Sequence, residues 1–349
     1  VGGELRHHHQ VAFSGLDPVV ASGAQVPLAG GIGLHRGGDL YAERVAHSTS
    51  ATATRMVPAT MATSTNEVRC GRKGLKPMAD HRRAAPAPGR VPLMFTITDQ
   101  GSVRTLTIDN PGRRNAVPRE GWMQLAGHLD GFASSDQRAL VITGAGGDFC
   151  SGADLGGDLA AMASSVTRYE WMENVASATR ALHRLAKPTV AAVDGVAVGA
   201  GMNLALGCDV VIASDRSRFS EIFVRRGLTV DFGGTWLLPR LIGLAKAKEL
   251  ALTGRIVGGA EAEALGLVSR VVPAGDLEAE AAAVAVELAV GAPLAQRFVK
   301  QGFDRSLEMS FDEALEYESL AQVTCMGSED VVEGITAFVE KRDPEFRGR

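Results

Sequence analysis

The stretch "KPTVAAVDGVAVGAGMNLALGCDVVIAS", residues 187–214, decides the fold class. It begins with a short apolar run, passes through closely spaced glycines, and ends in a second run rich in Val and Ile. Short apolar runs next to glycine predict buried strands, here at 187–195 and 209–214. Between them, residues 199–208 predict a short helix. The order strand, helix, strand is typical of an α/β protein.

Similar patterns extend on both sides of this stretch. Toward the N-terminus, "MFTITDQGSVRTLTIDNP" from Met94 predicts two strands, and residues 119–135 predict a helix for which Pro118 suits the first position. A buried strand at 138–146 and a long helix at 168–185 follow. From Gly233 onward the chain is predicted to be nearly all helical, with helices at 277–290, 294–306, 311–323 and 328–341. We therefore predict an α/β or α+β protein with a C-terminal helical part.

Composition excludes several classes of function. The 349 residues carry a net charge of −4, which gives no support for a nucleic-acid partner. No apolar run approaches the roughly 20 residues that span a bilayer, so we expect no membrane partner. The four cysteines are far apart and predict neither a zinc site nor a disulfide framework: Cys70, Cys150, Cys208 and Cys325. They fit a reducing, cytoplasmic location.

Residues 1–93 differ from the rest of the chain. They carry 11 Lys/Arg and 6 Asp/Glu, a net charge of +5, and six of the eight histidines, including His7-His8-His9. No periodic apolar face persists in this segment, which buries too little to offset its ordering entropy. A transit peptide would avoid acids, and three histidines alone indicate a metal site or a tag only weakly. We expect residues 1–93 to be an N-terminal extension that is non-native or disordered.

Catalytic motifs of several large families are absent. The chain has no G-x-S-x-G, no G-x-x-x-x-G-K-[ST], no H-E-x-x-H and no G-x-G-x-x-G after a strand. After residue 93 the only histidines are His128 and His183, both on predicted helices, where packing or surface roles are favoured. A histidine-dependent triad is therefore disfavoured.

Two features can carry chemistry. The glycine-rich turns "FCSGADLGG" (149–157) and "GVAVGAGMNLA" (195–205) each follow a buried strand and free backbone N–H groups. Two such donors converging on one oxygen form an oxyanion hole, although the glycines taken alone favour the interpretation that they merely allow tight strand-to-helix turns. The second feature is Asp231, which lies between Val230 and Phe232 before a Gly-Gly pair. It is either a cap of the next helix or a catalytic acid or base held out of water.

Together these stretches resemble the crotonase superfamily of enoyl-CoA hydratases and isomerases. The matching segments occur in the order of that family: "NPGRRNAV", "ALVITGAGGDFCSGADL", residues 187–214, "RFSEIFVRRGLTVDFGGTWLLPRLIG", "ALTGRIVGGAEAEALGLVSRVVP" and "AFVEKRDPEF". The resemblance covers residues 94–349 and not 1–93. It implies a spiral of ββα units over 94–290 and a C-terminal helical region over 291–349 that forms trimers or dimers of trimers.

The resemblance also implies a site for an acyl-CoA thioester, with coenzyme A as part of the substrate and no permanently bound cofactor or metal. The N–H groups of Ala153 and Ala200 would hold the thioester oxygen. Along the adenine and pantetheine arm it implies Ser151, Asp154 and Leu155. Facing the CoA phosphates it implies Arg113 and Arg114. Closing over CoA from a neighbouring subunit it implies Phe338 and Lys341.

The sequence departs from the hydratase pattern at both usual glutamates. Their positions hold Asn203 and Phe223, and neither side chain transfers a proton. Asp231 occupies a third position, where some isomerases of the superfamily carry their base, and "GLTVDFGGTWLLPR" is especially similar to the phenylacetate-pathway isomerase branch. The resemblance thus favours double-bond isomerisation with Asp231 as acid/base. A hydratase with a rearranged site and a CoA-binding protein with little catalysis are the alternatives.

Two further residues have open roles. Glu221 lies two positions before the usual glutamate, so it is either a second catalytic group or, as favoured, a surface residue or an ion-pair partner of Arg225 or Arg226. Asn203 could orient water or substrate by hydrogen bonding, or support the turn by packing.

Overall fold

The computed structural model describes residues 94–156 and 164–349, and the extension expected over residues 1–93 lies outside them. The described part begins with a β-hairpin of β1 (Phe95–Gln100) and β2 (Val103–Ile108), which pair antiparallel with Phe95 opposite Ile108. This hairpin is the one that the sequence from Met94 predicts.

Nine strands form two sheets in the described residues. The larger sheet has the order β1-β2-β3-β4-β6-β9, in which every pair after the first hairpin is parallel; its further strands are β3 (Ala139–Gly144), β4 (Thr189–Val193), β6 (Val210–Ser214) and β9 (Arg270–Val272). The smaller sheet joins β5 (Val196–Val198), β7 (Arg218–Ser220) and β8 (Val257–Gly258). Both sheets contribute segments to the candidate site.

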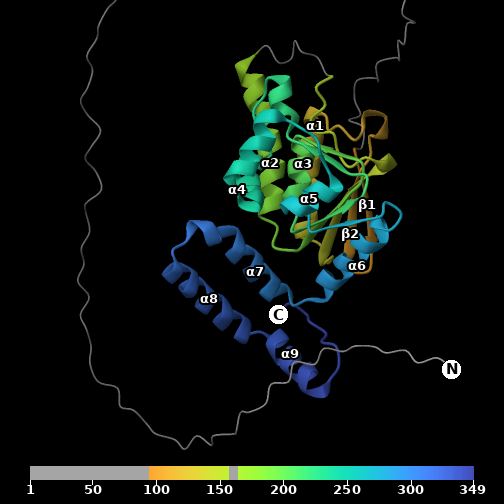
Figure 1. The fold of residues 1–349 in the computed structure, drawn as a ribbon. Helices are drawn as coiled ribbons and strands as arrows, with labels where there is room; N and C mark the ends of the chain where they lie inside the picture. Colours follow the sequence, from red (N-terminus) through yellow and green to blue (C-terminus); the bar gives the residue numbers. More distant parts are fainter. Residues whose placement is uncertain (1–93, 157–163) are drawn as a thin grey trace, which may run out of the picture. The chain divides into compact units, whose positions relative to one another are not determined.

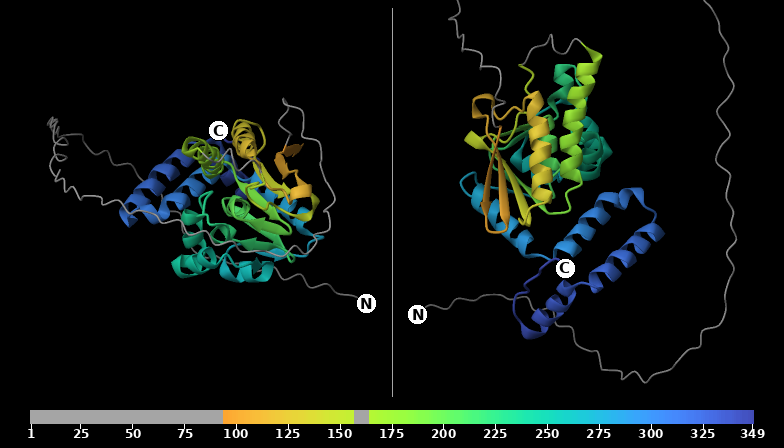
Figure 2. Two further views of the ribbon diagram at one scale, coloured as in Figure 1. Left: turned by 90° about the horizontal axis from the view of Figure 1, so that it is seen from above. Right: turned by 180° about the vertical axis from the view of Figure 1, so that it is seen from behind.

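The larger sheet separates two apolar cores, because successive side chains of a strand point to opposite faces. On one face Val141 and Val190 pack with α6 (Leu277–Val290). On the other face Ile142 and Ala191 join the main core, which also contains residues of α1 (Arg119–Ala133), α2 (Ser165–His183) and α3 (Ala200–Leu206). Figure 2 shows α1 and α2 side by side over this face, and α3 is buried along its whole length. The described part is thus an α/β protein, as predicted, and it has helices on both faces of the larger sheet.

The helices on either side of β8 build the outer wall of the main core. A 3-10 helix (Ile222–Arg226) leads to α4 (Gly234–Thr253), and α5 (Gly259–Leu265) follows β8. Gly243 interrupts α4 with a φ of 73°, so the helix kinks there. Figure 1 places α3 and α4 on the same side of the sheet.

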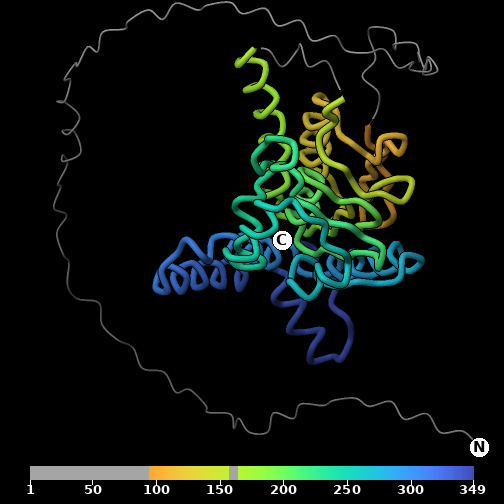
Figure 3. Tube along the Cα trace, turned by 45° about the horizontal axis from the view of Figure 1, so that its top comes forward, coloured from red at the N-terminus to blue at the C-terminus, as the bar shows by residue number. Residues whose placement is uncertain are grey.

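Three more α-helices follow α6 in the described residues, within the predicted C-terminal helical region. They are α7 (Pro293–Arg305), α8 (Phe311–Met326) and α9 (Glu329–Glu340). Figures 1 and 3 show α7 and α8 packed side by side as a hairpin. Glu308, between them, accepts hydrogen bonds from Trp236 Nε1 and Arg240 Nη2 of α4, each at 3.2 Å. These bonds join the C-terminal region to α4, the helix that follows Asp231.

The structure corrects some element bounds. Pro118 is the N-cap of α1 and not its first residue, and α2 begins at Ser165 and ends at His183. The nearly all-helical prediction after Gly233 missed β8 and β9, which are two and three residues long. Among the described residues no single helix could cross a membrane; only α6 with residues 293–308, bent by 109°, meets the length and composition criteria as a pair.

Candidate active site

The two glycine-rich turns meet at the edge of the smaller sheet. Cys150 pairs with Ala197 of β5, since Cys150 N–H donates to Val196 O at 2.9 Å and Val198 N–H donates to Cys150 O at 3.0 Å. A Cβ atom at Gly201 would lie 2.2 Å from the Cys150 carbonyl oxygen, so only glycine allows α3 to start this close to the neighbouring chain.

The backbone N–H groups of Ala153 and Ala200 lie on the two sides of this junction. Gly152 has a φ of 89°, and a Cβ built on it would lie 3.4 Å from Ala200 N, which shows how closely the turns approach. Ala200 is the first residue of α3, where the N–H has no partner within the helix. In the described residues no backbone hydrogen bond uses either N–H. Both groups are therefore available to an external acceptor.

Asp231 is a half-buried carboxylate for which the described part of the chain offers no side-chain partner. Its Oδ1 is buried and accepts no hydrogen bond within the described residues. Burial raises the pKa of Asp231 from 3.8 to about 6. The N-cap of α4 is Gly233, and no side chain caps that helix. The helix-cap interpretation of Asp231 is therefore not supported. The structure instead holds the carboxylate of Asp231 partly out of water.

Phe232 fixes the backbone after this aspartate. It has a φ of 48°, in the left-handed region that bulky residues rarely adopt, yet its ring is buried and packs on Trp122 with 5.3 Å between ring centroids. The packing of the ring holds a turn that the residue does not favour by itself. Asp231 is thus oriented by a buried aromatic contact with α1.

The expectation that Glu221 lies at the surface or pairs with an arginine is wrong. Its side chain is fully buried, and no ion pair with Arg225 or Arg226 exists among the described residues. Its Oε2 lies 3.4 Å from Nδ2 of Asn203, which also donates to the Asp231 carbonyl oxygen at 3.0 Å. Asn203 therefore supports the turn and brings Glu221 and Asp231 to one cluster. The short strand β7 ends at Ser220, and this end directs the next side chain inward.

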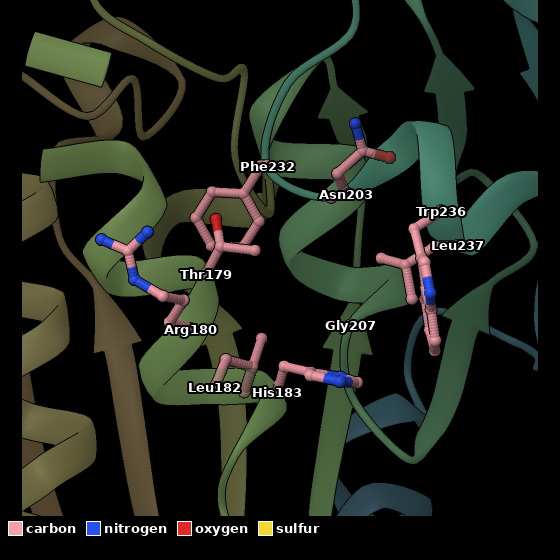
Figure 4. A pocket seen from close by; sticks show the side chains of 10 residues that line it. Thr179, Arg180, Leu182, His183, Asn203, Gly207, Phe232, Trp236 and Leu237 are labelled. Atoms are coloured by element: carbon pink, nitrogen blue, oxygen red, sulfur yellow. The ribbon is translucent and has the colours of Figure 1, made fainter. Parts of the chain in front are cut away.

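An apolar cavity of about 220 Å³ lies beside this cluster. Asn203, Phe232 and Trp236 line it, together with His183, whose ring meets Trp236 edge to face at 5.1 Å (Figure 4). Asp231 is not among the lining residues, but the two residues after it are. The packing role expected for His183 is confirmed, and so is that of His128, which packs on Phe95. The role of Phe232 and Trp236 in a cavity was missed, although both are large apolar residues in the segment that follows Asp231.

The residues expected to meet the CoA arm come together at the end of the first turn. Arg113 Nη2 lies 2.7 Å from Asp154 Oδ1, and Ser151 N–H donates to Arg114 O at 3.0 Å. Leu155 is 44% exposed beside them. The structure thus gathers all five predicted residues on one surface, where the guanidinium of Arg113 is half exposed.

Other predicted positions stand apart. Phe223 packs on the start of α3, with its ring 3.4 Å from where a Cβ of Gly199 would be. Phe338 lies on α9 with 83% of its surface exposed, and Lys341 caps that helix. Within the described residues neither Phe338 nor Lys341 forms a hydrogen bond or ion pair with the Asp231 cluster. No group of three or more metal-ligating side chains occurs there either.

Comparison with known proteins identifies the family to which this chain belongs. A family profile described as "Enoyl-CoA hydratase/isomerase" matches residues 98–349, and the chain belongs to this family, the crotonase superfamily that its motifs resemble. The chain is 37% identical over 255 residues to the 1,2-epoxyphenylacetyl-CoA isomerase of Escherichia coli K12, covering 71% of this chain and 95% of that protein. It is 34% identical over 254 residues to the short-chain-enoyl-CoA hydratase of Clostridium acetobutylicum, covering 72% and 96%.

A solved structure agrees. The enoyl-CoA hydratase from Polaromonas sp. JS666 superposes with a TM-score of 0.70 at 32% identity, covering 72% of this chain and 99% of that one. The predicted family and fold class are confirmed. Because both hydratases and isomerases are among the relatives, family membership does not select the reaction.

Proposed function

We propose that this enoyl-CoA hydratase/isomerase family enzyme moves a double bond within an enoyl-CoA, with Asp231 as its acid and base. One observation carries the proposal: the carboxylate of Asp231 is half buried and unpartnered beside an apolar cavity, whereas Asn203 and Phe223 stand at the usual glutamate positions. A pKa of about 6 suits a base that works near neutral pH. A protein that only binds CoA has no need of such a carboxylate.

The chemistry needs one proton and one oxyanion hole. In a 3-enoyl-CoA, the Asp231 carboxylate removes a proton from the carbon next to the thioester. The electron pair of that C–H bond forms a new carbon–carbon double bond to the thioester carbon, and the π pair of the carbonyl moves onto the thioester oxygen. The N–H groups of Ala153 and Ala200 stabilise the resulting dienolate. Asp231 then returns the same proton to the far end of the former double bond, and a 2-enoyl-CoA results without gain or loss of atoms.

The remaining predicted residues bind the CoA part of the substrate. The exposed Arg113 and Arg114 would meet phosphates, for which guanidinium groups are well suited. Ser151, Asp154 and Leu155 would lie along the adenine and pantetheine arm. Phe338 and Lys341 would act from a neighbouring subunit of a trimer or a dimer of trimers, which agrees with the exposed Phe338 ring.

Hydration of a 2-enoyl-CoA is the second candidate, because the site holds a second buried carboxyl, Glu221, next to Asn203. Adding water requires a group that activates it and a group that protonates the carbon. Two carboxyls could divide these roles. We prefer isomerisation because Asp231 directly precedes two lining residues of the apolar cavity, Phe232 and Gly233, whereas Glu221 is connected to the lining through Asn203.

Incubation of the purified protein with a panel of 2-enoyl-, 3-enoyl- and ring-bearing acyl-CoAs tests the proposal. Isomerisation leaves the mass of the product unchanged, whereas hydration adds one water. In D₂O, exchange of a carbon-bound proton reports enolate formation in either case. Accumulation of 3-hydroxyacyl-CoA without isomerised product would select the hydratase, and the absence of both turnover and exchange would select the binding protein.

A further inference from the structure

Glu221 is a buried carboxyl that the reaction above does not use. Its side chain is fully buried, and its Oε1 accepts no hydrogen bond within the described residues. It directly precedes the 3-10 helix at 222–226, but its side chain does not cap that helix. A helix-capping or ion-pairing role therefore does not explain why a carboxyl stands here.

The charged groups of the surrounding elements do not compensate this carboxyl. Arg225, on the adjoining 3-10 helix, donates to the Thr253 carbonyl, and Glu249 of α4 pairs with Lys246 and Arg255. The other charged side chains of these two elements are Arg226, Arg240 and Lys248, of which Arg240 bonds to Glu308. On α3 the facing group is the neutral amide of Asn203. The charge of Asp231 acts on Glu221 and raises its pKa.

An uncompensated buried carboxylate is unfavourable, so the proton stays on the carboxyl. Burial and, to a smaller extent, the charge of Asp231 raise the pKa of Glu221 to about 8, and the bond from Asn203 only partly opposes this. Asp231 ionises at lower pH, with a pKa of about 6. Near neutral pH the cluster therefore contains one carboxylate, Asp231, and one neutral acid, Glu221.

Asn203 connects the two groups. Its Nδ2 contacts Glu221 Oε2 and the Asp231 carbonyl oxygen, and its Oδ1 is buried without a partner. Resting on the function proposed above, we propose that Glu221 is a positioning residue, whose protonated carboxyl holds Asn203 and through it the Asp231 segment in the working arrangement. Loss of its proton adds a second negative charge beside the forming dienolate and disfavours the reaction.

The test is the substitution Glu221→Gln, which keeps the shape of the neutral acid and cannot ionise. Wild-type turnover should fall above about pH 8, whereas Glu221→Gln should keep at least about half of the turnover at neutral pH and lose this decline. The exposed Glu287 of α6 supplies a matched control, since Glu287→Gln should keep the wild-type profile. A decline that persists unchanged in Glu221→Gln overturns the proposal. A loss of turnover as large as that of Asp231→Asn also overturns it, because Glu221 would then exchange protons itself.

A second measurement needs no turnover and so separates this inference from the proposed function. Infrared difference spectra between wild type and Glu221→Gln should contain a protonated-carboxyl band at about pH 6.5 that disappears by about pH 9.5. If no such band exists, the inference fails even when the enzyme is an isomerase. If the band is present but no enoyl-CoA is isomerised, Glu221 is a neutral buried acid and the proposed function is what fails.

Discussion

Gly201 touches Cys150 backbone to backbone: a Cβ added to Gly201 would lie 2.2 Å from the Cys150 carbonyl oxygen. This contact sets the distance between the Ala153 and Ala200 N–H groups, because each lies within a few residues of it. The alignment of the proposed oxyanion hole therefore depends on one glycine.

Gly201→Ala should lower turnover at least about 100-fold, as removal of an oxyanion-hole donor does. The added methyl group should also destabilise the fold by about 1–3 kcal/mol through overpacking. Gly127→Ala is the matched control, since a Cβ at this position of α1 meets no atom within 4 Å, and it should raise the melting temperature slightly. Wild-type turnover and melting temperature in Gly201→Ala would contradict the contact.

Asp231→Asn should lower kcat by about 10²–10⁴-fold, because it removes the proposed base and keeps the shape. Affinity for CoA, which we propose rests on backbone and phosphate contacts, should barely change, and KM should not rise. Steady-state kinetics and proton exchange in D₂O measure the effect, with Asp130→Asn on the exposed side of α1 as the control. Full exchange in Asp231→Asn would remove the main support for isomerisation.

The pH dependence of kcat/KM should show an acid limb. Asp231 must be ionised to accept a proton, and burial raises its pKa to about 6, so activity should rise with pH through about 6 and level off above it. Initial rates between about pH 4.5 and 7.5 measure this. A constant rate down to about pH 4.5 would mean that the carboxyl keeps an ordinary pKa.

Glu221 should make stability depend on pH. Its pKa is about 8 in the folded protein against an ordinary 4.5, so the folded state binds the extra proton between these values. The free energy of unfolding contributed by this group is therefore fully present below about pH 4.5 and is lost as pH rises toward 8. A shift of one pH unit corresponds to about 1.4 kcal/mol. The free energy of unfolding of Glu221→Gln, compared with that of wild type, should therefore be larger at pH 8 than at pH 5 by up to a few kcal/mol. Urea denaturation at both pH values measures the difference, and an equal effect at both would contradict it.

Acyl-CoA binding should depend on assembly. Phe338 is 83% exposed in the single chain, and we propose that it closes over CoA in a neighbouring subunit. Phe338→Ala should weaken acyl-CoA binding about tenfold with little change in kcat. Sedimentation and calorimetry test both parts, and a stable monomer with undiminished CoA affinity would exclude the shared site.

The sequence predicts the regular elements well where a periodic pattern is long. The helix at 277–290 matches α6 at both ends, and the runs around 189–193 and 210–214 are buried strands. β8 and β9 were missed because two or three residues carry no detectable periodicity. Their pairing depends on neighbouring strands that are distant in the sequence.

The site could be predicted only in part. Asp231 stands out in the sequence as a carboxylate between apolar residues, but the choice between cap and acid required the N-cap of α4 to be seen at Gly233. The direction of Glu221 is set where a three-residue strand turns into a 3-10 helix, and no local pattern encodes it. The bond between Trp236 and Glu308 joins residues 72 positions apart, beyond any sequence periodicity.

The left-handed turn at Phe232 limits how this enzyme can evolve. Glycine there would relieve about 1–3 kcal/mol of backbone strain. The same change would leave a void against Trp122 that costs about 3–5 kcal/mol, as truncation of a buried phenylalanine does. Selection for thermal stability therefore has no favourable single step that relaxes this turn. The orientation of Asp231 therefore depends on Trp122 of α1, against which Phe232 packs. Substitutions at Phe232 and Trp122 should occur together.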